Sequence, residues 1–183
     1  HLSLFTAPAT VDRDQESDPA AYEAVIDAVR QMTPCVIVDL PHLWTPWIKQ
    51  TMQAADEICI VAAPDLASLR NAKGIVDMMK QSRPNDTPPK LIMNQVGVPK
   101  RPEIPVKDFA ETLGIPATLI VPFDPALFGA AANNGQMLPE VQPNAPAAQA
   151  IVRMAEMLTG RQPVPEEKSV LPFLSFLKGK KRA

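Results

Sequence analysis

The sequence predicts an α/β fold with a mostly parallel central sheet and helices on both faces. Short apolar runs bounded by turn residues alternate with longer segments of helical periodicity, which is typical of successive strand–helix units. The composition is that of an ordinary globular protein, with 46% hydrophobic and 21% charged residues in 183. A formal net charge of -2 argues against a strongly basic nucleic-acid-binding protein, so we expect no nucleic-acid partner.

Five apolar runs have the length and boundaries of strands. They are Leu2 to Ala7, Pro34 to Asp39, Glu57 to Ala63, Lys90 to Asn94 and Ala117 to Pro122. The middle three are continuously apolar, as expected for strands that are covered on both faces.

Apolar residues at helical spacing predict the intervening helices. They are Tyr22, Val25, Ile26 and Val29 in the first helix, and Leu69, Ala72, Val76 and Met79 in another. Thr45 before Pro46 is expected to cap a helix that runs to about Ala55. Phe109 and Leu113 predict a short helix that Gly114 ends.

Asn144 and Pro146 open a last long helix, which Gly160 closes. We therefore expect one α/β domain over residues 1–160, a polar, proline-bearing linker over 161–170 and a separate tail over 171–183. Cys35 and Cys59 each lie in an apolar run and are expected to be buried, which fits a reducing cytoplasm.

Polar side chains follow four of the predicted strands, where ligands bind in open parallel sheets. They are Asp39, Asp65, Asn94 and Asp124. For Asp65 and Asp124 we favour a helix cap or turn, since Asp forms such local hydrogen bonds. For Asp39 and Asn94 we favour a function, because an aspartate after a buried strand can hold Mg²⁺ beside phosphates.

The ordered set of motifs resembles the MinD/ParA class of P-loop ATPases, and in particular its CpaE/TadZ pilus-assembly branch. Cys35 to Trp44 is similar to that branch's second acidic motif, with His42-Leu43-Trp44 as its His-x-Trp variant. Pro64 to Lys73 is similar to the segment leading into the next helix, and Leu91 to Gln95 resembles the strand whose asparagine contacts adenine. Val121 to Pro125 and Ala130 to Gln136 resemble the loop and helix over the base, so the likeness runs from about Leu2 to Leu158.

This resemblance implies a P-loop NTPase-like fold with ATP and Mg as cofactors of the intact protein. It implies that Asp39 holds Mg²⁺ through water and acts in catalysis. It also implies a base site, formed by Asn94, Pro122, Asp124 and Asn133.

The phosphate-binding segment of the family is missing from the sequence. Such a loop has the form G-x-x-x-x-G-K-[ST], and the glycines at 74, 97, 114, 129, 135, 160 and 179 provide none. We therefore expect this chain alone neither to bind ATP tightly nor to hydrolyse it. We also expect a longer protein, whose first strand and phosphate loop precede His1.

As a function, the resemblance implies a localisation or scaffold protein of type IVb (Flp) pilus assembly, acting through homodimerisation and recruitment of pilus or secretion machinery. It implies a cytoplasmic protein at the cell pole or the inner-membrane surface. Candidates for the partner or dimer surface are His42, Trp44, Trp47 and Arg70. Other interpretations remain open for these residues. They are helix packing for the two tryptophans, a surface or capping role for His42 and a solvated helix face for Arg70.

The tail combines apolar and basic residues. They are Leu171, Phe173, Leu174, Phe176, Leu177, Lys178, Lys180, Lys181 and Arg182. With four positive charges in the tail and a total of -2, the rest of the chain carries about -6. The tail suits shallow insertion into an anionic membrane surface, whereas a disordered or core-docking tail is the alternative.

Two other functions stay open. An active MinD/ParA-type ATPase in partitioning or cell-division positioning would require a lysine-bearing phosphate loop upstream. A flavodoxin-like or receiver-like binding module would place acidic residues after the first strand, where Thr6-Ala7-Pro8 has none.

Overall fold

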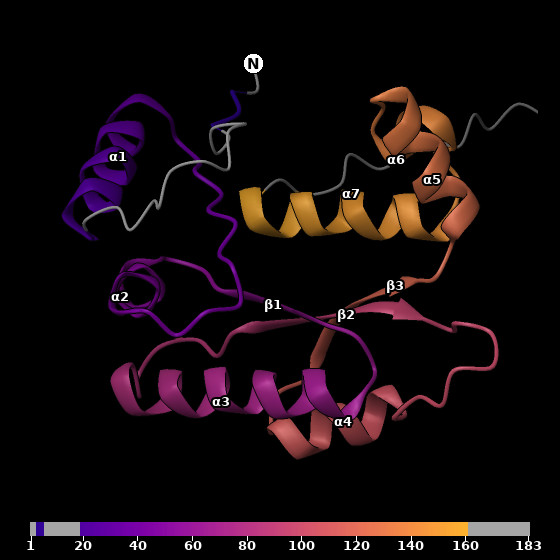
Figure 1. The fold of residues 1–183 in the computed structure, drawn as a ribbon, viewed down its shortest axis with the longest axis horizontal. Coiled ribbons are helices and arrows are strands. Elements are labelled where there is room, and N and C mark those ends of the chain that lie inside the picture. Colours follow the sequence, from indigo (N-terminus) through magenta and orange to yellow (C-terminus); the bar gives the residue numbers. More distant parts are fainter. Residues whose placement is uncertain (1–2, 6–18, 161–183) are drawn as a thin grey trace, which may run out of the picture. The chain divides into compact units, whose positions relative to one another are not determined.

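The computed structural model describes residues 3–5 and 19–160 (Figure 1). The chain divides into two compact units, of which one ends at Pro125 and the other begins at Ala126. Each unit is described by itself. No helix within the described ranges is both long and apolar enough to cross a membrane.

The first unit contains a parallel three-stranded sheet. Its strands are β1 (Cys59–Ala62), β2 (Lys90–Val96) and β3 (Ala117–Pro122), in the order β1-β2-β3. Ala62 pairs with Met93, and Met93 pairs with Ile120 on the other side. This sheet confirms the predicted α/β class and the last three predicted strands. β2 is the central strand, and its apolar run is buried as the sequence predicts.

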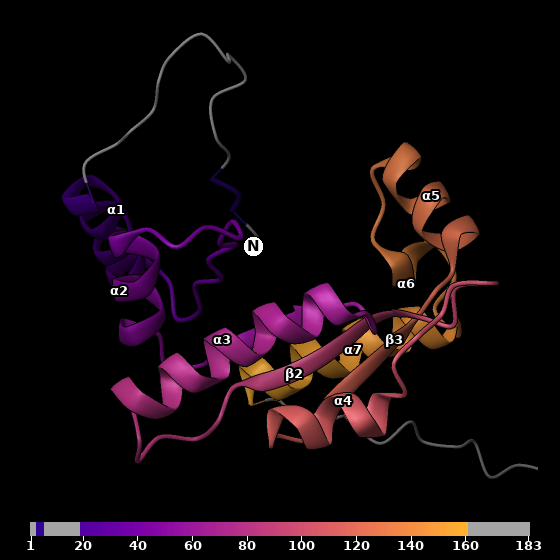
Figure 2. The same cartoon turned by 60° about the horizontal axis from the view of Figure 1, so that its bottom comes forward.

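Two helices cover one face of this sheet (Figure 2). They are α3 (Leu66–Ser82) and α4 (Val106–Leu113), and they lie side by side. The core under them consists of Ile60, Ala62, Ala72, Val76, Leu91, Met93, Phe109, Leu113 and Ile115. Gly114 adopts a left-handed conformation with φ 67°, and its N–H donates to the Ala110 carbonyl at 2.9 Å. The predicted end of α4 at this glycine is confirmed.

Two further helices precede the sheet in the sequence, α1 (Pro19–Met32) and α2 (Pro46–Ala54). Tyr22 of α1 stacks on Trp47 of α2, with ring centroids 4.4 Å apart and an interplanar angle of 9°. Ile48 and Met52 of α2 pack against Met79 of α3. The order of packing is therefore α1 on α2 and α2 on α3.

The start of α2 differs in detail from the prediction. Thr45 has the extended backbone of an N-cap, and its carbonyl accepts the Lys49 N–H at 3.2 Å. Its side chain makes no capping hydrogen bond, and the buried hydroxyl has no partner in the part of the chain that the structure describes. Pro46 at the first helical position begins the helix instead, because its fixed φ suits a first turn.

The strand predicted over Pro34 to Asp39 is wrong, and the strand predicted over Leu2 to Ala7 is not found in its described part. Residues 3–5, the described part of the segment Leu2 to Ala7, have no strand structure, and Pro34 to Asp39 is an unpaired segment in which Ile37 is 81% exposed. A strand requires backbone hydrogen bonds from a neighbour, whereas β1 pairs only with β2 among the described residues. Cys35 and Cys59 are both exposed, contrary to prediction, because they lie on this unpaired segment and on the edge strand.

The second unit is helical in its described part. Helix α5 (Pro125–Asn134) leads into it, followed by the short α6 (Leu138–Val141) and by α7 (Pro146–Thr159). The predicted last helix is confirmed, with Ala145 rather than Asn144 at its N-cap and Gly160 ending it in a left-handed conformation, φ 66°. The predicted linker and tail lie outside the described residues, and the single domain over 1–160 stays an expectation.

Candidate functional site

The carboxyl ends of the three parallel strands meet at one edge of the sheet, where the sequence predicts the site. Asn94 directly follows Met93, which pairs with Ile120 of β3. Farther along, Val96 pairs with Pro122, and the Phe123 N–H donates to the Val96 carbonyl at 2.8 Å. The structure therefore brings Asn94 and Pro122 to one edge, and Asp124 follows Phe123 there.

Asn94 is half-buried within β2. Its side-chain oxygen accepts the Gln95 N–H at 2.9 Å, while its amide nitrogen has no hydrogen-bond partner in the described ranges. An asparagine amide offers two donors and a carbonyl acceptor, which is the pattern that matches the edge of a nucleobase. The register of β2 breaks between Met93 and Val96, and Gln95 has a positive φ of 56°. This irregularity ends the regular strand next to Asn94.

The loop after β2 is held by the Glu103 carboxylate. The Gly97 N–H donates to its two oxygens at 3.1 and 3.0 Å, and the Val98 N–H donates at 3.0 Å. Arg101 pairs with Glu103 at 2.9 Å and also donates to the Gln95 carbonyl. The Gly97 N–H is the main cause that lowers the pKa of Glu103, with Arg101 and the Val98 N–H acting in the same direction against partial desolvation.

This loop is also attached to the end of β1, because the Ile104 N–H donates to the Pro64 carbonyl at 2.9 Å. Asp65, the next residue, caps α3 by accepting the Ser68 N–H at 2.7 Å. The capping interpretation of Asp65 is therefore confirmed.

Sequence reasoning missed Glu103 and Arg101. Gly97, with Pro99 and Pro102, marks the turn, but nothing in the sequence pairs it with a particular carboxylate.

Asp39 is exposed and follows the unpaired segment Pro34 to Asp39 rather than a sheet strand. Within residues 3–5 and 19–160, no three or more His, Cys, Asp or Glu side chains gather as a metal site. The structure therefore gives Asp39 no preformed carboxylate partner there. Its assignment to magnesium stays a prediction.

Asn133 belongs to the second unit, where it is exposed near the end of α5. The helix ends through the Gln136 N–H, which donates to the Ala131 carbonyl at 2.9 Å, and through Gly135 with φ 63°. Its role in base binding also stays a prediction.

The four candidates for a partner surface differ in how their side chains pack. Trp47 is occupied by its stack on Tyr22, as the helix-packing interpretation predicts. Trp44 is 46% exposed. Its ring and the His42 ring have an edge-to-face arrangement, with ring centroids 6.3 Å apart. Arg70 is exposed on α3. Trp44 and Arg70 line one groove, whereas Trp47 does not.

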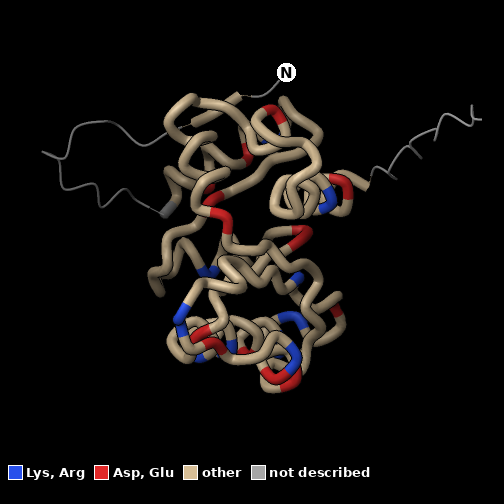
Figure 3. The backbone as a smooth tube through the Cα atoms, turned by 90° about the vertical axis from the view of Figure 1, so that its right-hand side faces the viewer, with Lys and Arg blue, Asp and Glu red and all other residues tan. Residues whose placement is uncertain are grey.

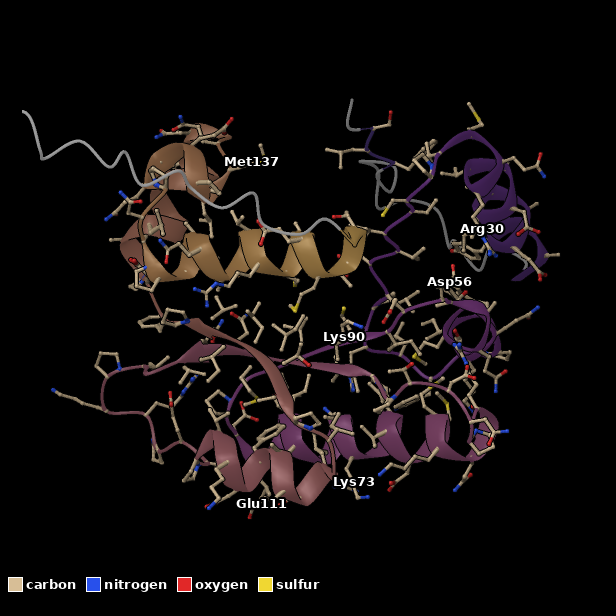
Figure 4. All side chains as sticks on the ribbon, turned by 180° about the vertical axis from the view of Figure 1, so that it is seen from behind. Arg30, Asp56, Lys73, Lys90, Glu111 and Met137 are labelled. Carbon is tan, nitrogen blue, oxygen red and sulfur yellow. The ribbon has the colours of Figure 1, made fainter. Side chains whose placement is uncertain are left out.

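Several other charged side chains of the first unit form ion pairs. Lys73 pairs with Asp77 at 2.6 Å, Lys90 with Glu57 at 2.5 Å, and Lys107 with Glu111 at 3.8 Å. Figure 4 shows Lys73 on α3, Glu111 on α4 and Lys90 at the start of β2. The tail residues from Leu171 to Arg182 lie outside the described residues.

No family model matches the chain. It is 29% identical over 178 residues to an uncharacterized ATP-binding protein from Methanocaldococcus jannaschii, covering 96% of this chain and 66% of that protein. It is 26% identical over 94 residues to the septum site-determining protein MinD from Bacillus subtilis, covering 51% of this chain and 35% of MinD. The chain thus spans only part of each relative.

Solved structures share the fold. A ParA family ATPase from Chlorobium tepidum matches with a TM-score of 0.69 and 23% identity, over 81% of this chain and 61% of that one. MinD from Pyrococcus horikoshii, complexed with Mg-ADP, matches with a TM-score of 0.64 and 21% identity, over 76% and 56%. A MinC:MinD complex from Aquifex aeolicus matches with a TM-score of 0.64 and 22% identity, over 79% and 60%. The chain is therefore similar in sequence to the two relatives named above and has the α/β fold of the MinD and ParA family ATPase structures.

Proposed function

We propose that the chain is part of a nucleotide-binding, MinD/ParA-like protein that localises or scaffolds type IVb (Flp) pilus assembly, as in the CpaE/TadZ branch. The observation that carries the nucleotide part is the sheet edge at which Asn94 and Pro122 lie on neighbouring strands. The pilus part is supported by the His42-Leu43-Trp44 variant of the acidic motif. In the intact protein we expect this function to act through dimerisation and recruitment of pilus or secretion proteins.

The proposal gives each residue a chemical task. Asn94 hydrogen-bonds the adenine edge with its amide, and Pro122 and Asp124 lie beside it at the same sheet edge. The resemblance to the family assigns Asn133 to the base as well. Asp39 binds Mg²⁺ through water, because a hard cation prefers oxygen ligands. Bound Mg²⁺ would neutralise phosphate charge. The phosphate contacts are assigned to residues outside these 183, since this sequence has no G-x-x-x-x-G-K-[ST] segment.

The relatives support the cofactor and the mode of assembly without fixing either for this chain. One relative is named as ATP-binding, one solved MinD holds Mg-ADP, and another is in a complex with MinC. By analogy, we propose ATP with Mg and a protein partner. The surface that we assign to the partner or dimer contact comprises His42, Trp44, Trp47 and Arg70. The His42 ring contacts the Trp44 ring, whereas Trp47 stacks on Tyr22.

The test uses the intact protein that contains this chain. Calorimetric titration with Mg-ATP should give saturable binding, and sedimentation should show a dimer that ATP favours. Absence of both binding and dimerisation would overturn the proposal. Binding that is accompanied by sustained ATP hydrolysis would instead favour an active ATPase of partitioning or cell-division positioning.

A further inference from the structure

A groove lies between the start of α2 and the outer face of α3. Its volume is about 650 Å³, and its lining includes Trp44, Lys49, Ala67, Arg70, Asn71 and Gly74. All of these residues belong to the first unit. The groove is distinct from the sheet edge that carries Asn94, because none of the edge residues lines it.

The two walls of the groove are fixed to each other by packing. Ile48 and Met52 of α2 are buried against Met79 of α3. The Arg83 guanidinium, just after α3, donates to the carbonyls of Met52 and Ala55 at 3.3 and 2.6 Å, and so ties down the end of α2. The groove is therefore a preformed surface, which lowers the ordering cost of binding.

The lining of the groove carries two positive charges and no negative charge. Lys49 and Arg70 line it, neither makes an ion pair or side-chain hydrogen bond in the described ranges, and no carboxylate is in the lining. The neighbouring Lys73 is neutralised by Asp77 at 2.6 Å. Figure 3 shows basic and acidic positions interspersed along the backbone.

Gly74 lies in the interior of α3, where glycine costs about 1 kcal/mol relative to alanine. A Cβ built there would meet only Trp44 Cζ2, at an ordinary contact distance of 4.0 Å. Packing within the unit therefore does not require glycine. Its effect is to leave the groove open beside the half-exposed Trp44, with Asn71 one turn and Ala67 two turns earlier on the same helix.

We infer that this groove binds an acidic, amphipathic helical segment of a partner protein. Apolar side chains of such a helix would contact Trp44 and Gly74, while its carboxylates would pair with Lys49 and Arg70, which is the helix-in-groove mode of recognition. Two cations in a concave site beside a tryptophan fit a short acidic helix better than a nucleic-acid backbone or a membrane, which would require a broad basic surface. The inference rests on the recruiting role proposed above and names the chemistry of the partner.

The probe is a short helical peptide of Glu, Leu and Ala, and the matched probe carries Lys in place of Glu. In a Trp47→Phe variant of the 183-residue chain, Trp44 is the single tryptophan and reports directly on the groove. The acidic peptide should shift the Trp44 emission to the blue and reduce its quenching by acrylamide in a saturable manner. The basic peptide should do neither. An equal response to both peptides, or no response to the acidic one, would overturn the inference.

Charge reversal locates the binding. The double variant Lys49→Glu with Arg70→Glu should bind the acidic peptide at least about tenfold more weakly, because both electrostatic attractions become repulsions. Lys107→Glu with Arg30→Glu makes the same change in net charge at residues that do not line the groove, and should leave binding unchanged. Gly74→Leu should block binding without changing any charge, and circular dichroism checks that each variant is folded.

Equal losses in the groove and control variants would contradict the inference. An equally strong Trp44 response to phosphatidylglycerol vesicles or to a single-stranded oligonucleotide would also contradict it, in favour of those ligands. No ATP is present in these measurements. A lack of peptide binding in these measurements is therefore distinguishable from a lack of nucleotide binding.

Discussion

The Glu103 carboxylate accepts the backbone N–H of Gly97 with both oxygens, at 3.1 and 3.0 Å. This contact closes the loop that follows β2 and adjoins Asn94. Together with Arg101 it gives an irregular segment a defined conformation, although the segment contains residues with positive φ at Gln95, Gly97 and Lys100. The candidate base site therefore depends on a carboxylate that does not itself contact the base in our proposal.

Glu103→Ala should loosen this loop while leaving the sheet folded. Loss of the carboxylate leaves the N–H groups of Gly97 and Val98 without their acceptor. Hydrogen exchange, measured residue by residue, should rise at these two amides and remain unchanged in β2 and α4. Glu111→Ala, which removes an exposed carboxylate paired only with Lys107, is the control. Unchanged exchange at Gly97 would show that the loop does not need Glu103.

The same contact predicts a pH dependence. The pKa of Glu103 is lowered on folding, chiefly by the Gly97 N–H, so its contribution to stability is fully present above the ordinary glutamate pKa. That contribution is lost as the pH falls through the lower, folded value. A carbon-13 NMR titration of the Glu103 carboxyl should give a midpoint below the usual 4.5, and Arg101→Ala should raise it. A midpoint at or above 4.5 in the unmodified chain would contradict this assignment.

Arg83→Ala should destabilise the first unit by roughly 1–3 kcal/mol, because the carbonyls of Met52 and Ala55 lose a charged donor. The measurement is the free energy of unfolding from denaturant titration. Arg153→Ala removes an exposed arginine that makes no hydrogen bond or ion pair within the described residues, and should change stability little. Equal effects of the two variants would mean that Arg83 does not hold α2 in place.

The tail prediction concerns residues outside the described ranges. We predict that liposomes containing phosphatidylglycerol retain the 183-residue chain in a flotation assay, and that deletion of residues 171–183 reduces this retention. The reason is the apolar and basic composition of the segment, in which each basic residue near an anionic surface contributes roughly 1 kcal/mol. Identical flotation of the two forms would favour a tail without membrane affinity.

Local signals in the sequence were sufficient to predict most of the helices. Phe109, Leu113 and Gly114 define α4 because spacing and a left-handed terminator act within one or two turns. The same holds for Pro46 at the start of α2 and for Gly160 at the end of α7. The three strands that have neighbours in the structure were also predicted, since each is a short apolar run between turn residues.

Features that depend on distant partners were not predictable in this way. The run from Pro34 to Asp39 has the composition of a strand, yet strand formation depends on a neighbouring backbone that the described residues do not supply. The loop bonds of Glu103 arise in irregular backbone, where periodicity carries no information. The edge position of Asn94 was predictable because it follows from strand direction alone, whereas the groove beside Gly74 depends on how α2 packs on α3.

The most direct test of the account is the effect of Asn94→Ala on nucleotide affinity in the intact protein. Calorimetric titration with Mg-ATP should show binding at least about tenfold weaker than in the unmodified protein, since a base-reading amide is lost. Asn85→Ala removes an exposed asparagine from a turn away from the sheet edge and should leave the affinity unchanged. Equal ATP affinity for the Asn94→Ala variant and the unmodified protein, with both folded, would contradict the assignment of this edge as the nucleotide site.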